Sequence, residues 1–109
     1  AQSISLLKRP NRPTAIFAGS DLQAMGVYEA ARQLGLRIPE DLSVVGFDDV
    51  QTAAFLGPAL TTVRQPLQDM ARAAVRMLVE ALSTDDVIQP HIIMPTSLVV
   101  RNSTQQLEG

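Results

Sequence analysis

Three short apolar runs of this sequence each end on polar side chains that can form hydrogen bonds. The first run leads into Ser20 and Asp21, the second into Asp48, and the third into Gln65. Apolar runs of this length are typical of buried strands, and ligands of parallel α/β sheets bind just beyond the carboxyl ends of the strands. We therefore expect these side chains to surround one polar pocket.

Asp48 is the sharpest candidate for a ligand contact. An ionised carboxylate accepts up to about four hydrogen bonds and donates none, which suits a ligand with adjacent donors, such as a sugar diol or a nucleobase N–H. Gln65 both donates and accepts, so it would complement Asp48. Asp48 and Gln65 can instead be caps of the helices that follow them, and Ser20 can equally be the N-cap of the helix after the first strand. Both interpretations stay open from the residues alone.

The sequence gives little support for a catalytic site or a metal site. Asp48 and Asp49 are adjacent, and neighbours on an extended segment point in opposite directions, so they are poorly placed as a catalytic pair. His91 is the only histidine, no G-x-S-x-G elbow accompanies it, and we interpret it as a strand or edge residue. Cysteine, a P-loop and a dinucleotide-binding glycine pattern are all missing from the sequence. We expect no enzyme activity, no catalytic residue, no metal site and no cofactor.

Apolar periodicity and helix-end signals divide the chain into alternating strands and helices. Regular apolar spacing predicts a helix over Asp21–Leu34 that Gly35 ends, and Pro66 suits the first position of a second helix that runs to Leu82. Strands are expected at Ala15–Ala18, Leu42–Phe47, Leu60–Val63, His91–Met94 and Ser97–Val100, and shorter helices at Ala1–Leu7 and Val50–Leu56. The second long helix is expected to bury Leu67, Met70, Ala71, Ala74, Leu78 and Leu82.

This alternation indicates an α/β fold with a mainly parallel sheet flanked by helices. Phe17 and Phe47 are expected in its core, with Phe55 less certain. A sheet of three or four strands with few helices would leave one face uncovered. We therefore expect an incomplete fragment, or one that a second copy completes, and the first residue, Ala1, fits a natural start further upstream.

Composition argues against contact with DNA or a membrane. The net charge is −2 and the charges are interspersed, whereas duplex DNA binding needs clustered Lys and Arg. No run approaches the roughly 20 apolar residues that span a bilayer, and no signal peptide is visible. The absence of cysteine fits a reducing cytosol, so we expect a cytoplasmic location.

Three separated motifs follow one another along the chain: SDLQAMGVYEAARQLGLRIPEDLSVVGFDD, then PALTTVRQP, then MPTSLVVRNST. Together they resemble the C-terminal part of the LacI family of bacterial transcription regulators over about Pro13–Thr104. The resemblance implies a periplasmic-binding-protein-like type I fold, cut from an effector domain of two lobes. A helix-turn-helix and a hinge helix, through which the family binds DNA, would precede it and are absent here.

The resemblance also implies where the lobes divide. Residues 1–64 would be a portion of the C-terminal lobe, residues 65–93 a helix and strand of the other lobe, residues 94–104 a return strand to the C-terminal lobe, and residues 105–109 a tail.

Site residues follow from the same resemblance. The position of Asp48 contacts the effector, usually a sugar or nucleobase, and Gln65 lies at the cleft where the chain crosses between lobes. Ser20, often Asn in the family, also faces the cleft, whereas Asp21 matches an acid that supports structure. Family dimers bury the surface that would hold the residues Met25, Thr52, Phe55 and Leu56, and we expect Phe55 and Leu56 to be exposed.

The first interpretation is therefore the effector-binding and dimerisation segment of a LacI-type regulator. Its partners would be a small sugar-like or nucleobase-like effector, a second copy of the chain, and DNA through the absent N-terminal domain. A periplasmic sugar-binding protein for transport or chemotaxis is the alternative, and a flavodoxin-like or other α/β enzyme is a more distant one.

Overall fold

The computed structural model describes residues 2–83 and 92–107. The elements in chain order are α1 (Gln2–Leu7), β1 (Ala15–Phe17), α2 (Asp21–Gln33), β2 (Ser43–Asp48), the 3₁₀ helix η1 (Gln51–Phe55), β3 (Thr61–Arg64), α3 (Leu67–Ser83) and β4 (Ser97–Val99). They form two compact units. The first unit joins Ala1–Arg64 with Ser97–Gly109, and the second unit is Gln65–Thr96.

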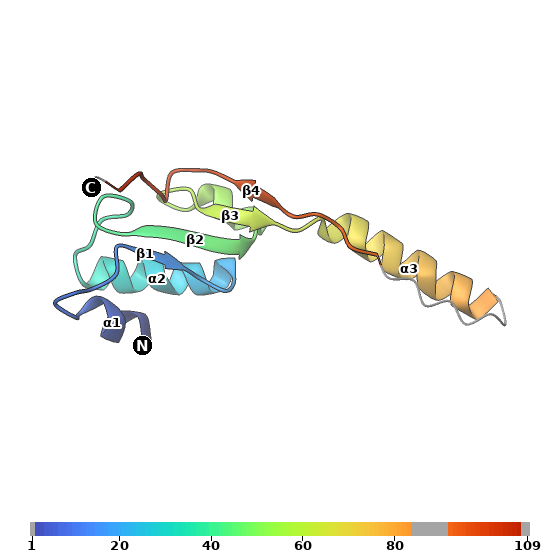
Figure 1. Cartoon of the computed structure of the whole chain (residues 1–109), viewed down its shortest axis with the longest axis horizontal. Helices are drawn as coiled ribbons and strands as arrows, with labels where there is room; N and C mark the ends of the chain where they lie inside the picture. Colours follow the sequence, from blue (N-terminus) through green and yellow to red (C-terminus); the bar gives the residue numbers. More distant parts are fainter. Residues whose placement is uncertain (1, 84–91, 108–109) are drawn as a thin grey trace. The chain divides into compact units, whose positions relative to one another are not determined.

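One four-stranded sheet organises the first unit, in the order β1-β2-β3-β4 (Figure 1). The first three strands are parallel and β4 runs antiparallel to β3. The predicted α/β class with a mainly parallel sheet is confirmed. Because β1, β2 and β3 are parallel, their carboxyl ends meet at one edge of the sheet.

Helix α2 has clear start and stop signals. The Ser20 hydroxyl accepts the Gln23 backbone N–H at 3.1 Å, which satisfies one of the first free donors of the helix. At the other end Gly35 has a φ of 70°, and the Leu36 N–H bonds the Ala31 carbonyl at 2.9 Å. This pattern is a Schellman motif, in which glycine adopts the left-handed conformation without steric cost.

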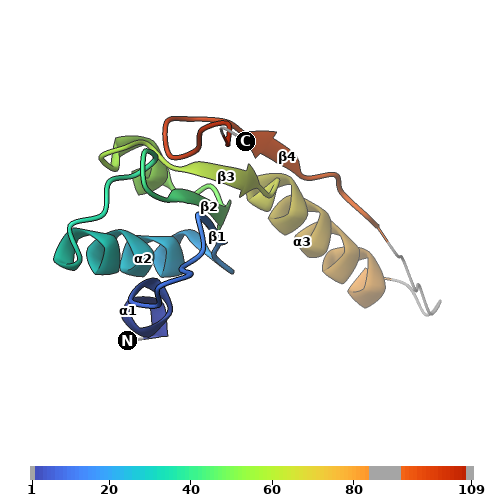
Figure 2. The same cartoon turned by 60° about the vertical axis from the view of Figure 1, so that its left-hand side comes forward.

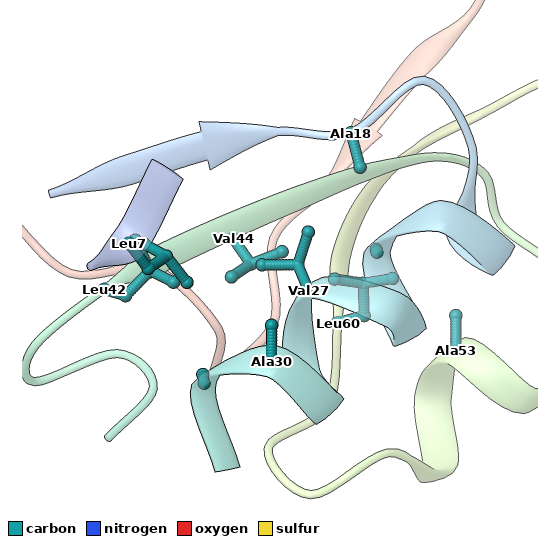
Figure 3. Packing of buried hydrophobic residues seen from close by; sticks show 10 residues of the cluster. Leu7, Ala18, Val27, Ala30, Leu42, Val44, Ala53 and Leu60 are labelled. Atoms are coloured by element: carbon teal, nitrogen blue, oxygen red, sulfur yellow. The ribbon is translucent and has the colours of Figure 1, made fainter. Parts of the chain in front are cut away.

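The core lies between α2 and the sheet, and Figure 3 shows its aliphatic side chains. Val27 and Ala30 of α2 pack in one cluster with Leu42 and Val44 of the second strand segment and with Leu60 just before β3. Helix α1 lies beside α2 in both views (Figures 1 and 2). Complete burial of each larger aliphatic side chain stabilises the fold by about 1.5–3 kcal/mol.

The opposite face of the sheet is less covered. Along β2, Val44 and Gly46 are buried while Val45 and Phe47 are only half-buried, because successive side chains of a strand point to opposite faces. Phe17 lies 66% exposed in β1. The prediction that Phe17 belongs to the core is therefore wrong, since the core forms only on the side that α2 covers.

The second unit contains α3. Among its described residues the predicted buried face is not buried: the side chains that were expected to form it are all exposed, namely Leu67, Met70, Ala71, Ala74, Leu78 and Leu82. A helix buries its apolar stripe only against another element, and the described part of this unit has no second helix or strand. The strand predicted at His91–Met94 is absent at residues 92–94, and His91 lies outside the described residues.

Candidate functional site

The carboxyl edge of the parallel strands holds two of the three predicted ligand residues. Strand β2 ends at Asp48, and Ser20 follows β1 in the turn that leads into α2. Gln65 directly follows β3 along the chain and is the first residue of the second unit. The first unit therefore brings Asp48 and Ser20 to the same edge of its sheet.

Asp48 and Asp49 have an uncommon backbone conformation. Their φ angles are 119° and 61°, a region that costs a non-glycine residue about 1–3 kcal/mol. Two consecutive residues persist there only when their surroundings hold them. Asp48 is half-buried, and the residues that hold this segment in place are Asp21 and Asp49.

The first residue that holds the segment of Asp48 and Asp49 in place is Asp21, which has no exposed surface. One oxygen accepts the Thr62 hydroxyl at 2.6 Å, and the other accepts the Val50 N–H at 2.8 Å. Gly46 leaves room for the Asp21 carboxylate, because a Cβ at position 46 would overlap it. Asp21 thus ties α2 to β3 and to the turn after Asp49, which agrees with the structural role that the resemblance implied.

The second support is Asp49, whose side chain is 9% exposed. Arg64 Nε donates to Oδ2 at 2.6 Å, and Arg101 Nη2 donates to Oδ1 at 2.8 Å. Burial raises the pKa of the Asp49 carboxyl, but the hydrogen bonds and charges of Arg101 and Arg64 outweigh burial, so the net shift of the pKa is downward. Asp49 is an internal anchor, a role that the sequence interpretation missed.

The C-terminal segment closes the sheet through Ser103, which was also missed. Its hydroxyl donates to the Val44 carbonyl at 2.5 Å and accepts the Thr61 N–H at 2.8 Å. Its own carbonyl accepts the Val44 N–H at 2.9 Å. Ser103 therefore fills the place between β2 and β3 where the two strands do not bond to each other. Nothing in its sequence neighbourhood, beyond a small polar residue after an apolar run, signals this role.

Of the predicted dimer residues, Phe55 is exposed, at 82%. Thr52 is also exposed, while Met25 and Leu56 are half-buried. The expectation that Leu56 is exposed is wrong, because Leu56 packs against the core cluster. Met25 and Leu56 line one hollow of the first unit together with Tyr28 and Pro58, and the Tyr28 hydroxyl donates to the Pro58 carbonyl at 2.8 Å.

Within residues 2–83 and 92–107, no group of three or more His, Asp or Glu side chains is arranged to hold a metal ion. In the same part of the chain, no helix has the length and apolar character that crossing a membrane requires.

Comparison with known proteins identifies the family. The profile of the periplasmic binding protein-like domain matches residues 1–104. The chain belongs to this family. It is 52% identical over 93 residues to an uncharacterised HTH-type transcriptional regulator of Streptomyces limosus, a match that covers 85% of this chain and 26% of the relative.

Similar solved structures narrow the assignment from the periplasmic binding protein-like family to LacI-type regulators. The dimeric lac repressor bound to operator and the anti-inducer ONPF is 33% identical, with a TM-score of 0.84 over 94% of this chain and 36% of the repressor chain. A LacI family regulator from Enterococcus faecium with bound ribose is 27% identical, with a TM-score of 0.89 over 97% of this chain and 39% of the other. The chain is thus part of a LacI-type effector domain, and it spans about a quarter to two fifths of the length of these proteins.

Proposed function

We propose that this chain is the effector-binding part of a LacI-type transcription regulator, and that Asp48 binds a small polyhydroxyl ligand such as a sugar. The observation that carries the proposal is the fixed position of Asp48. It ends β2 at the carboxyl edge of a parallel sheet, on a half-buried segment that Asp21 and Asp49 hold in place. Sheets of this class bind ligands at this edge.

The chemistry of a carboxylate favours a sugar. Adjacent hydroxyls can both donate to the two oxygens of Asp48, and hydrogen bonds with an ionised acceptor are roughly twice as strong as neutral ones. The related Enterococcus faecium regulator was solved with ribose and a Lactobacillus casei regulator with sucrose. Gln65 and Ser20 remain predicted additional contacts, although the Ser20 oxygen already caps α2.

The proposed mechanism is linkage. A ligand that binds one arrangement of the effector domain better shifts the protein toward it, by no more than its differential affinity. DNA binding would be carried out by a helix-turn-helix outside this chain, and the protein would act in the cytoplasm. We also propose that residues 1–64 and 94–104 belong to one lobe, and that residues 65–93 belong to the other.

Calorimetry on the complete regulator that contains this chain tests the ligand proposal. Wild type and Asp48→Asn are titrated with ribose, sucrose and a nucleoside, and Asp41→Asn serves as control because Asp41 precedes the opposite end of β2. We expect Asp48→Asn to weaken binding by about 1.5–3 kcal/mol, which is the strength of a hydrogen bond to a charged group. Equal affinity of wild type and Asp48→Asn would show that the ligand binds elsewhere.

A second part of the proposal concerns self-association through the surface that carries Phe55. A large apolar side chain that is almost fully exposed suits an interface. Light scattering should show a smaller assembly for Phe55→Glu than for wild type. Leu107→Glu, which changes an exposed leucine near the C-terminus, should leave the mass unchanged. If both variants keep the mass of wild type, Phe55 is not an interface residue.

A further inference from the structure

We propose that Asp49 is a positioning residue for ligand binding: its carboxylate, shared by Arg64 and Arg101, holds Asp48 in its positive-φ conformation and fixes both chain connections to the second unit. This inference rests on the proposed binding role of Asp48. It assigns a function to Asp49 even though its own carboxylate is already occupied by the two arginines.

The first argument is conformational. Asp49 follows Asp48 directly, and both have positive φ angles. Backbone in this region relaxes unless neighbouring groups hold it. The nearly buried Asp49 carboxylate accepts two charge-assisted hydrogen bonds of 2.6 and 2.8 Å, and the N–H of the next residue, Val50, donates to Asp21. The orientation of the Asp48 carboxylate therefore depends on how firmly Asp49 is held.

The second argument comes from the places of the two arginines along the chain. Arg64 is the last residue before the second unit begins at Gln65. Arg101 follows β4, the strand with which the chain re-enters the first unit after Thr96. One carboxylate thus anchors the chain on both sides of the inserted residues 65–96.

The two ion pairs are unequal. The Arg101 side chain is 17% exposed, and it also donates to the Leu60 carbonyl at 2.8 Å, while its backbone N–H donates to Thr61 Oγ1 at 2.9 Å. Arg64 is 56% exposed, and an exposed ion pair is screened by solvent. Arg101 is therefore the main partner of Asp49, and the more exposed Arg64 is the weaker one.

The experiment compares Asp49→Asn with Asp41→Asn in the complete regulator. Asp41 is a suitable control because it also pairs with one arginine, Arg37, at the surface of the same unit. Hydrogen exchange is followed at the Val50 and Arg101 amides. We expect faster exchange at both amides in Asp49→Asn and no change in the control. Unchanged exchange at both amides in Asp49→Asn would overturn the proposed anchoring role.

Sugar affinity is then measured by calorimetry in the same proteins. We expect Asp49→Asn to weaken binding about tenfold, a factor that corresponds to about 1.4 kcal/mol, and Asp48→Asn/Asp49→Asn to bind as Asp48→Asn does. A purely stabilising role would lower the urea midpoint and leave affinity unchanged, and additive losses would mean that Asp49 acts independently of Asp48. Either result overturns the positioning role.

Arginine variants add a rescue test that needs no change at Asp49. Arg101→Lys keeps the positive charge and should retain most of the affinity and of the amide protection, whereas Arg101→Met should lose both. Equal behaviour of these two variants would refute the ion-pair argument. If wild type binds none of the sugars, the proposed function fails, while amide exchange still decides whether Asp49 anchors the connections.

Discussion

Replacement of Asp21 by alanine should be among the most damaging single substitutions in the first unit. The carboxylate has no exposed surface and accepts the Thr62 hydroxyl and the Val50 N–H. Asp21→Ala leaves both donors without this acceptor. An unsatisfied buried donor costs about 1–3 kcal/mol, and Val50 is 38% exposed, so water can partly rehydrate its N–H. We expect the free energy of unfolding to fall by about 3 kcal/mol.

Urea denaturation followed by far-UV circular dichroism measures this loss. Asp21→Asn keeps one acceptor but turns an NH₂ group toward a donor, so its stability should lie between those of wild type and Asp21→Ala. Glu29→Ala is the control, because Glu29 lies on the same helix in an exposed pair with Arg32. If Asp21→Ala unfolds at the same urea concentration as Glu29→Ala, the two buried hydrogen bonds do not contribute as argued.

Substitutions at three further residues test other supports of the sheet. Ser20→Ala removes the cap of α2 and should lower the free energy of unfolding by about 1 kcal/mol, whereas Ser20→Asn should keep it; urea denaturation distinguishes the two. Ser103→Ala removes the hydroxyl that bonds Thr61 and Val44 and should cost about 1–3 kcal/mol in the same assay. The pKa of Asp49 is lowered in the folded state, so its stabilising effect is present above its ordinary pKa of about 3.8 and is lost as the pH falls through the lowered value. Asp49→Asn should therefore make urea midpoints less sensitive to pH below about 4; equal sensitivity would contradict the shift.

Local signals were sufficient to predict most elements of the described part of the chain, although the strand predicted at His91–Met94 is absent at residues 92–94. Ser20 and Gly35 mark the ends of α2, and the capping and Schellman bonds explain why. The predicted strands at Leu42–Phe47 and Leu60–Val63 appear as β2 and β3, each shifted by one residue. Asp48 could be placed at a strand end because parallel topology follows from the alternation of strands and helices.

Features that depend on distant residues could not be predicted in this way. Asp49 was considered only beside Asp48, whereas its partners Arg64 and Arg101 lie 15 and 52 residues away. Phe17 was expected in the core because an apolar run does not show which face of the sheet a helix covers. The apolar stripe of α3 was expected to be buried because periodicity shows which face of a helix is apolar, but not whether another element packs on it.

The bonds of Ser103 have a consequence for the order in which the chain folds. They join residues 42 and 59 positions apart, and the whole second unit is synthesised between the partners. During synthesis on the ribosome, β2 and β3 are made before Ser103. The hydrogen bonds that Ser103 forms with both strands can therefore form only later. Contacts this far apart in sequence slow folding. Completion of the sheet should therefore depend on Ser103 and its neighbours, which are synthesised after both strands.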